Sequence, residues 1–330
     1  MLGICNINNS NNENNPLIVG VGSTGSKITL EIVKEVKSEA GYLLLNSKRS
    51  NNKNENNIII DPGAWINPSI YKIRESFMEK LEKILPIINN FSNIIIIGNL
   101  ASKFGSAIIP MLTNILHKFG DKIIISFVIM PFGFEKERIF HSGLSLSFIN
   151  KYSNSTIVVD NNSFLKNNPE LSIPECFKIT NNAIKDIIFT SFDKGFPNEF
   201  NVIATSKESN CLEDAFSRTF TMSNNSKIQS VEKTSMFVYP AKEKIDSIDS
   251  VVKTAEKIAN ESDNEINLIN GSGCLSKIHF MIKTTHLLFS SYDPINQFVS
   301  INNFLDYEPE TNRKIQEISY LKDIEAKIIQ

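Results

Sequence analysis

The chain is poor in the residues that build disulfide frameworks and transition-metal sites. It has only four cysteines, with no CxxC pair, and only four histidines, with no HxxxH or HExxH pattern. The scattered cysteines exclude a disulfide-stapled scaffold, and neither residue type has the spacing of a zinc site. The sequence therefore gives no support to a thiolate zinc site or to a metalloprotease.

The chain also lacks a surplus of one charge and lacks long apolar runs. Lysine and arginine number 34 and aspartate and glutamate 36, so the formal net charge is −2. This balance is not typical of a nucleic-acid binder or a polybasic membrane protein. No apolar run reaches the roughly 18 residues of a membrane-spanning helix, and residues 1–16 lack the features of a signal peptide. We therefore expect a cytoplasmic protein that is not integral to a membrane.

The composition is otherwise that of an ordinary globular protein. The 330 residues are 41% hydrophobic and 21% charged, which is enough for two domains or one large α/β domain. The unusual feature is an excess of asparagine, with about 40 residues. We interpret this bias as the mark of an AT-rich genome rather than of a function.

Strands and helices alternate after residues 1–16, which we expect to form a disordered lead. Apolar runs rich in β-branched residues predict strands over 17–21, 42–45, 58–60, 93–97, 122–130 and 156–159. Helical periodicity predicts helices over 27–38, 70–86, 105–119, 135–151 and 174–190. This alternation predicts an α/β fold, with a parallel sheet and helices on both of its faces.

The pattern changes after about residue 200. It predicts a loop over 224–229, a strand over 234–239, an amphipathic helix over 245–262, and two paired strands over 265–270 and 277–288. We therefore expect five segments. They are a lead (1–16), a nucleotide-binding domain (17–173), a central helix (174–192), an α+β domain (193–306) and a charged tail (307–330).

A glycine-rich turn joins the first strand to the first helix. It reads Gly20-Val21-Gly22-Ser23-Thr24-Gly25-Ser26-Lys27 and matches the GxGxxG dinucleotide pattern, but not a Walker A loop. The acidic residue that usually follows the second strand is missing, and Lys48 and Arg49 stand there instead. An NADP-dependent dehydrogenase and a glycine turn without a ligand therefore both remain open from this motif alone.

Four further motifs follow in a fixed order. They are Gly63-Ala64-Trp65-Ile66-Asn67-Pro68, Pro131-Phe132-Gly133-Phe134-Glu135-Lys136-Glu137-Arg138, the strand and turn at 155–165, and Cys176-Phe177-Lys178-Ile179-Thr180-Asn181-Asn182. Together with the glycine turn, they resemble the tubulin/FtsZ family, and FtsZ more than tubulin. The resemblance covers about residues 17–290. It implies a Rossmann-like GTPase domain, a long central helix and a smaller α+β domain, and it makes a dehydrogenase a remote alternative.

The resemblance also implies a pocket for GTP or GDP. Carried over residue by residue, Gly22, Ser23, Thr24, Gly25, Ser26 and Lys27 would pass under the phosphates. Gly63 and Asn67 would face the terminal phosphate, and Glu135 and Arg138 would lie near the ribose and base. Asn161 and Asn181 would form hydrogen bonds with the guanine, since amide groups can pair with its edge.

The chain departs from the family at the second phosphate loop. The family's GGGTGTG is replaced by residues 101–107, in which only Gly105 remains a glycine. We expect Phe104 to fill part of the phosphate space, because a side chain there replaces a small residue. We also expect Lys27, Lys48 and Lys103 to neutralise phosphate charge in place of magnesium, whose need at this site stays open.

The acidic loop that completes the family's hydrolytic site across a subunit contact is also degraded. Its counterpart spans residues 195–202, where Glu199 stands for one acid and Asn201 for the other. Asparagine can orient a water molecule but cannot take its proton, so we expect slow or absent hydrolysis.

Two functions follow from the resemblance. The first is a nucleotide-binding protein that assembles head to tail into filaments, in cell division or cell shape. The second is a nucleotide-free pseudo-GTPase that acts as a scaffold or as the partner of an active FtsZ paralogue. The segment 318–329 has helical apolar spacing and is a candidate binding helix for a membrane-adaptor protein.

Overall fold

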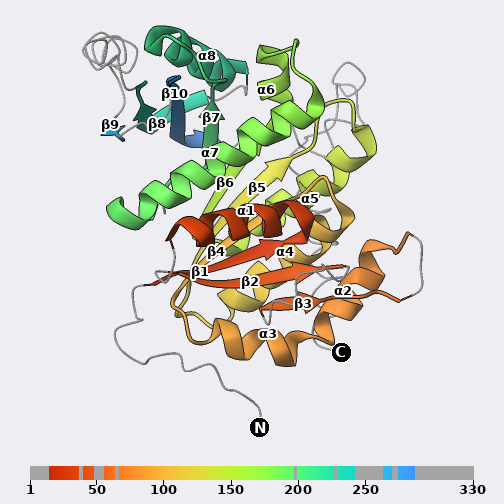
Figure 1. Ribbon diagram of the computed structural model, residues 1–330. Coiled ribbons are helices and arrows are strands. Elements are labelled where there is room, and N and C mark those ends of the chain that lie inside the picture. Colours follow the sequence, from red (N-terminus) through yellow and green to blue (C-terminus); the bar gives the residue numbers. More distant parts are fainter. Residues whose placement is uncertain are drawn as a thin grey trace, which may run out of the picture.

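A computed structural model gives the fold of the chain (Figure 1). It describes residues 15–36, 40–47, 56–63, 67–196, 199–225, 229–241, 263–269 and 274–286. Several expectations lie outside these residues, namely those for the lead up to residue 14, for Lys48, for the helix at 245–262 and for the tail.

The strands of the described residues form one continuous sheet. They are β1 (Leu17–Val21), β2 (Gly41–Asn46), β3 (Asn57–Ile59), β4 (Asn93–Asn99), β5 (Ile123–Met130), β6 (Ser155–Asp160), β7 (Val202–Thr205), β8 (Gln229–Tyr239), β9 (Asp263–Leu268) and β10 (Lys277–His286). Their order is β3-β2-β1-β4-β5-β6-β7-β10-β8-β9. The pairs from β3 to β7 are parallel, and β10 is antiparallel to both β7 and β8. The mostly parallel sheet confirms the predicted α/β fold class.

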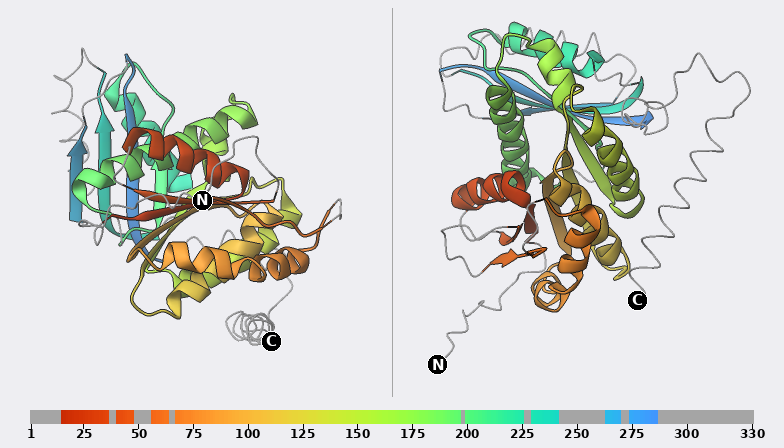
Figure 2. Two further views of the ribbon diagram at one scale, coloured as in Figure 1. Left: turned by 60° about the horizontal axis from the view of Figure 1, so that its bottom comes forward. Right: turned by 90° about the vertical axis from the view of Figure 1, so that its right-hand side faces the viewer.

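Helices cover both faces of this sheet (Figure 2). They are α1 (Gly22–Val36), α2 (Ile70–Met78), α3 (Leu81–Ile88), α4 (Lys103–His117), α5 (Lys136–Tyr152), α6 (Asn161–Asn167), α7 (Ile173–Lys194) and α8 (Leu212–Asn225). α1 and α7 lie side by side on one face, and α2 to α5 cover the other (Figures 1 and 2). An ion pair of 3.3 Å between Lys185 and Glu35 links α7 to α1.

The parallel strands β1, β4, β5, β6 and β7 contribute side chains to two apolar cores, one on either face of the sheet. In β4, Ile94 and Ile96 pack in the core beneath α2 to α5, whereas Ile95 and Ile97 pack against α1 and α7. All four are essentially buried, and each contributes about 2 kcal/mol by leaving water. Because side chains alternate along a strand, burial on both faces requires the unbroken apolar run that predicted this strand.

The helix predicted over 70–86 is wrong in one respect, because the structure has two helices there. α2 ends at Met78 and α3 begins at Leu81. Two bonds of three-residue spacing, Lys80 N to Phe77 O and Lys83 N to Lys80 O, interrupt the α-helical pattern between them. The apolar spacing stays helical across the break, so the sequence periodicity did not reveal it.

The C-terminal strands also differ from the prediction. The strands expected to pair with each other, β9 and β10, are separated by β8, which binds both. β8 and β9 are parallel, and a parallel pair needs a crossover of about a dozen residues or more, which the segment 240–262 supplies. The loop predicted over 224–229 is also wrong at both ends, since α8 runs to Asn225 and β8 begins at Gln229.

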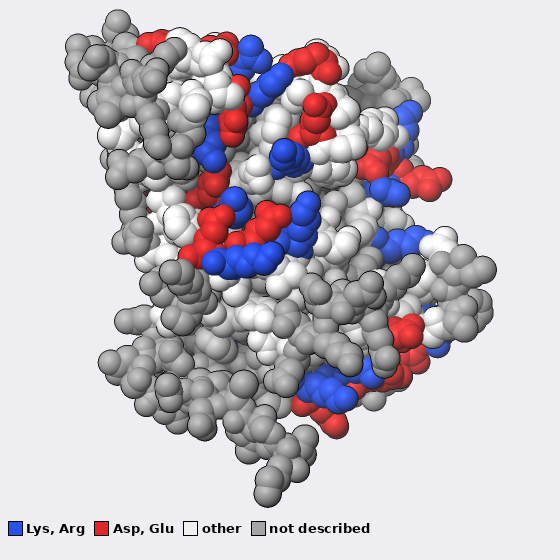
Figure 3. Space-filling view, in the orientation of Figure 1, with Lys and Arg blue, Asp and Glu red and all other residues white. Residues whose placement is uncertain are grey.

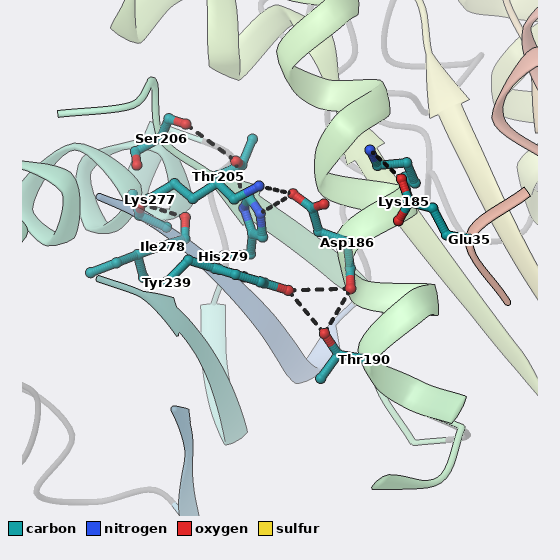
Figure 4. Close-up of polar contacts among 11 residues, drawn as sticks. Glu35, Lys185, Asp186, Thr190, Thr205, Ser206, Tyr239, Lys277, Ile278 and His279 are labelled. Carbon is teal, nitrogen blue, oxygen red and sulfur yellow. Dashed lines mark hydrogen bonds and ion pairs between the residues drawn. The ribbon is translucent and has the colours of Figure 1, made fainter. Parts of the chain in front are cut away.

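A buried polar network ties α7 to the C-terminal strands (Figure 4). The carboxylate of Asp186 forms an ion pair with Lys277 and lies 3.3 Å from Nε2 of His279. Nδ1 of His279 lies 2.8 Å from the hydroxyl of Thr205 on β7. The hydroxyl of Tyr239 on β8 donates to the carbonyl of Asp186. β8 and β10 are thus attached directly to Asp186, and β7 is attached to it through His279.

The protonation states in this network follow from burial and from the neighbouring polar and charged groups. Burial alone would raise the pKa of Asp186, but His279 and Lys277 outweigh it and hold that pKa below its ordinary value. Burial lowers the pKa of His279, which favours the neutral ring. Thr205 is fully buried, so no substrate can reach its hydroxyl, and we interpret the network as structural.

Candidate functional site

The candidate site lies at the edge of the sheet where the parallel strands end. β1, β4, β5 and β6 are neighbours, so the segments that follow them, which begin at Gly22, Leu100, Pro131 and Asn161, start at the same edge of the sheet (Figure 1). The strand order reverses between β1 and β4, because β2 and β3 lie on one side and β5 and β6 on the other. Ligands of open parallel sheets bind at such a reversal.

The glycines of the first loop have two different tasks. A Cβ on Gly25 would lie 2.1 Å from the carbonyl oxygen of Ile97, and one on Gly20 would lie 2.7 to 2.8 Å from atoms of α1. These two glycines let α1 pack tightly on β1 and β4. Gly22 has a φ of +72° and open space around it, apart from the ring of Phe104 at 3.6 Å. Gly22 is therefore the glycine that a ligand can approach.

The other residues of this segment also fall into two groups, one that packs within the protein and one that is open to a ligand. Ser26 is buried, and its hydroxyl donates to Oδ1 of Asn46 at 3.0 Å, which ties α1 to the end of β2. Ser23 and Lys27 are exposed and Thr24 is half-buried in the first turns of α1. The first N–H groups of a helix lack intrahelical partners and favour anions, so this end of α1 suits a phosphate.

The loop between β4 and α4 satisfies its own N–H groups. Oδ1 of Asn99 accepts from the N–H of Ala101 at 2.8 Å, and Oγ of Ser102 accepts from the N–H of Gly105 at 3.0 Å. A Cβ on Gly105 would lie 2.1 Å from the carbonyl oxygen of Asn99, so this glycine serves packing. The loop therefore offers a ligand fewer donors than a glycine-rich loop would.

Lys103 and Phe104 are the first two residues of α4, and they differ in their exposure to solvent. Phe104 is only 9% exposed and belongs to the core beneath α2 to α5, with its ring beside Gly22. Lys103 is exposed, and its ammonium donates to Oδ1 of Asn67 at 2.9 Å. Gly63 has a φ of +90° and donates to Asp61 at 3.0 Å. The structure thus brings Lys103 and Asn67 together.

Two side chains of α5 form hydrogen bonds with the β4–α4 loop and the first turn of α4. Pro110 has no N–H, so the carbonyl of Ser106 loses its helical partner, and the hydroxyl of Ser145 donates to it instead at 3.0 Å. The hydroxyl of Ser142 donates to the carbonyl of Leu100 at 2.8 Å. These two bonds from α5 fix the start of α4, and with it Lys103 and Phe104.

Glu135 and Arg138, expected near the ribose and base, bind each other. They form an ion pair across one turn at the start of α5, where Glu135 is half-buried and Arg138 is exposed. The second carboxylate oxygen of Glu135 accepts from the N–H of Phe132 at 3.1 Å. The pair therefore shapes the loop after β5, and a ligand contact by either residue stays a prediction.

Among the described residues, the amide group of Asn161 and the amide oxygen of Asn181 are buried without hydrogen-bond partners. Asn161 follows β6 and is fully buried, and neither of its amide atoms has a hydrogen bond among the described residues. Oδ1 of Asn181 on α7 is likewise buried and unpaired. The preceding residue, Asp160, is fully used, since it accepts from the backbone of Asn162 and Ser163. Buried amides without partners are rare and call for a missing ligand or water.

An aromatic group borders this region and was not singled out from the sequence. Phe134 is 60% exposed and stacks on Phe132, with ring centroids 5.3 Å apart. The ring of Phe177 on α7 packs edge-on against Phe132 at 5.1 Å. Phe177 and Asn181 are four residues apart on α7, so they lie on the same face of the helix. That spacing is the signal that could have identified the group.

Glu199 and Asn201 lie at the start of β7 and are engaged within the chain. Glu199 forms an ion pair of 3.5 Å with Lys233. Asn201 uses both amide atoms on the backbone of Thr284, donating at 2.8 Å and accepting at 3.2 Å. The expected catalytic role of these residues toward a neighbouring subunit stays a prediction, but Asn201 would have to give up two hydrogen bonds to perform it.

The charges on the surface are mixed in the face that Figure 3 shows. Acidic and basic side chains lie next to each other over α1 and α7, without a broad patch of one sign. Across the part of the chain that the structure describes, no helix is long and apolar enough to cross a membrane. The same residues include no group of three or more His, Cys, Asp or Glu side chains that could hold a metal ion.

Comparisons with known proteins connect this fold to one family. Residues 15–169 match the model of the Tubulin/FtsZ family, GTPase domain. No curated protein is similar to the chain at a significant level.

Solved structures agree with that match over most of the chain. A CetZ from Methanosaeta thermophila is similar with a TM-score of 0.62 and 14% identity, covering 95% of this chain and 97% of that one. An empty FtsZ dimer from M. jannaschii has a TM-score of 0.66 and 17% identity, over 84% and 91%. CetZ2 from Haloferax volcanii, solved as a GTPγS-bound protofilament, has a TM-score of 0.59 and 13% identity, over 86% and 99%.

Proposed function

Because the chain is a divergent, FtsZ-like member of the tubulin/FtsZ family of cytoskeletal proteins, we propose that it binds a guanine nucleotide and assembles head to tail into filaments, with weak or absent GTP hydrolysis. The nucleotide, GTP or GDP, would lie at the carboxyl ends of β1, β4, β5 and β6. Each part of this proposal has its own support.

The unpaired amide of Asn161 and the unpaired amide oxygen of Asn181 carry the proposal. A buried polar group without a partner costs about 1–3 kcal/mol, so these atoms indicate a ligand that completes their hydrogen bonds. The edge of a guanine offers both donors and acceptors, which suits an amide. Phe177, on the same face of α7 as Asn181, adds an aromatic surface against which a flat base can pack.

The phosphate side of the site fits less completely. Gly22 is open, and the first turns of α1 present free N–H groups, as a phosphate requires. At α4 the fit is poorer, because Phe104 stands beside Gly22 and the N–H of Gly105 is capped by Ser102. A nucleotide would therefore be held mainly through α1 and the base side.

The contacts that Glu199 and Asn201 make within the chain support weak GTP hydrolysis. Hydrolysis in trans needs a free acidic group to polarise the attacking water. Glu199 is paired with Lys233, and Asn201 is bonded to Thr284 and cannot take a proton. We expect a filament whose turnover by hydrolysis is slow.

The self-association of other proteins with this fold supports the filament part of the proposal. The CetZ2 structure is a protofilament and the FtsZ structure is a dimer, and this chain shares their fold. A contact between two different faces of one protein extends into a filament when it does not close. We place the filament in the cytoplasm, in cell division or cell shape, with an FtsZ paralogue or a membrane-adaptor protein at the tail as further partners.

The test is to denature purified protein, identify any released nucleotide, and titrate GTP, GDP and ATP. We expect guanine-selective binding with a Kd below about 10 µM, or about −7 kcal/mol, and sedimentable polymers with GTP. Absence of binding at millimolar nucleotide would contradict the proposal.

A second candidate function is favoured by Phe104. If its ring closes the phosphate side, the fold persists as a nucleotide-free scaffold or as the partner of an active FtsZ paralogue. The same titration distinguishes the two functions, since a scaffold would bind a protein partner but neither GTP nor GDP.

A further inference from the structure

We propose that the ammonium group of Lys103 binds the phosphates directly and makes nucleotide binding independent of a divalent cation. This inference rests on the proposed function and concerns the same site.

The ammonium group of Lys103 is held by a hydrogen bond and, among the described residues, has no carboxylate partner. It is the first residue of α4, directly after the N-cap Ser102, where the helix dipole is also positive. Its ammonium is bonded to a neutral amide oxygen, that of Asn67, at 2.9 Å. Among the described residues, no carboxylate lies within ion-pair distance of it. The hydrogen bond therefore positions the charge between two loops without neutralising it.

Other basic groups gather around Lys103. Arg74 of α2 reaches α4 through a 3.4 Å bond to the carbonyl of Ala107. Burial lowers the pKa of His141 on α5, and the positive charges of Lys103 and Arg74 lower it further. Like charges that face one region repel, and an anion bound among them removes the repulsion. Three helices thus contribute to a place suited to phosphate.

The β4–α4 loop has few free backbone N–H donors for a phosphate, and we infer that Lys103 attracts the phosphate in their place. The N–H groups of Ala101 and Gly105 are occupied by Asn99 and Ser102, so they are not free for phosphate. A site that has lost such donors needs another source of attraction, and a lysine ammonium is a compact charge with three donors. Because Lys103 is exposed, its ammonium is accessible to a ligand at this edge.

A magnesium ion does not fit these residues. Magnesium takes oxygen ligands, commonly one or two carboxylates together with phosphate. The groups here are an ammonium, a guanidinium and an imidazole, which repel a cation or bind it poorly. Asp61 is the only acidic residue of segment 61–69, and its Oδ1 already accepts from Gly63. The residues around Lys103 therefore favour direct contact with the anion.

The experiment measures GDP binding by calorimetry, with EDTA and with magnesium, for the wild type and three variants. In the wild type we expect the two affinities to agree within about twofold. Lys103→Met should weaken binding in EDTA about tenfold or more, and Lys103→Arg should restore most of it. Lys118→Met, an exposed lysine at the opposite end of α4, should bind as the wild type does.

A second readout uses inorganic pyrophosphate and the NMR titration of His141. Pyrophosphate bound at Lys103 should raise the pKa of His141 in the wild type and in Lys118→Met, but not in Lys103→Met. GDP binding that requires magnesium, or that is equal in Lys103→Met and the wild type, would overturn this inference and leave the proposed function intact, because GDP still binds. If GDP binds neither with EDTA nor with magnesium, the proposed function fails and the inference fails with it.

Discussion

The ring of Phe104 stands beside Gly22, so that a Cβ on Gly22 would lie 3.6 Å from Cδ1 of Phe104. Gly22 is the open glycine of its loop, because Gly20 and Gly25 are closed in by packing. A bulky core side chain therefore borders the place where a phosphate would approach. This contact narrows the space beside the N-terminus of α1.

Replacing Phe104 with alanine should strengthen nucleotide binding and weaken the fold. The ring is 9% exposed and packs in the core, so its loss should lower the free energy of unfolding by about 3 kcal/mol. The space gained beside Gly22 should raise the affinity for GTP by about threefold or more. Urea unfolding and nucleotide titration measure the two effects. Leu112→Ala, two turns further along α4, is the matched control and should lose stability without any gain in affinity.

Replacing Asn161 with alanine should have the opposite pair of effects. In the free protein this amide is buried without partners, so its removal should leave the free energy of unfolding unchanged or slightly higher. GDP affinity should fall about tenfold, because the base loses a hydrogen-bonding group.

The matched control for this prediction is Asn114→Ala. Asn114 is also buried with an unpaired amide nitrogen, but it lies near the far end of α4, about 16 Å along the helix from Lys103. Its loss should not change GDP affinity. An unchanged affinity in Asn161→Ala would show that the base does not bind at this amide.

The parallel half of the fold could be predicted from the sequence because burial on both faces leaves a visible mark. β4 and β5 are isoleucine-rich apolar runs, and runs of this length between helical segments are typical of strands that are buried on both faces. β7 was missed because it has only four residues. α8 was also missed, although its amphipathic pattern is comparable to that of α1, which was predicted. The order of β8, β9 and β10 depends on crossovers that no local pattern encodes.

The candidate site was visible only in part. Glycine spacing located the loop, but only the backbone showed that Gly25 and Gly105 pack against carbonyls while Gly22 stays open. Asn161 was one of about 40 asparagines, and its burial without partners depends on long-range packing. The contact of Lys103 with Asn67 joins residues 36 positions apart, which composition and periodicity cannot reveal.

Replacing Asp186 with asparagine should destabilise the protein strongly. The change keeps the shape of the side chain but leaves the buried surroundings and Lys277 without a negative partner. We expect a loss of about 2–4 kcal/mol in the free energy of unfolding, measured by urea titration. Asp214→Asn breaks the exposed pair with Arg218 and should cost less than about 1 kcal/mol. Equal losses in the two variants would contradict a special role for Asp186.

Acidification should weaken the fold through His279 before it does so through Asp186. The ring lies among Asp186, Lys277, Tyr239 and Thr205, and burial lowers its pKa from the ordinary 6.5. Below about pH 6.5 the unfolded chain takes up a proton that the folded chain refuses, so stability falls as the pH falls. The pKa of Asp186 is also lowered, and its contribution is present above about 3.8 and is lost only at lower pH.

We therefore predict that His279 makes the free energy of unfolding depend on pH between pH 7 and pH 5. In the wild type the free energy of unfolding should fall with decreasing pH, with up to about 1.4 kcal/mol per pH unit from this residue. His279→Gln should have a flatter profile, because glutamine does not titrate. His117→Gln, which changes an exposed ring on α4, should keep the wild-type slope. A slope that is the same in His279→Gln and the wild type would mean that another group, such as His141 with its own lowered pKa, causes the acid sensitivity.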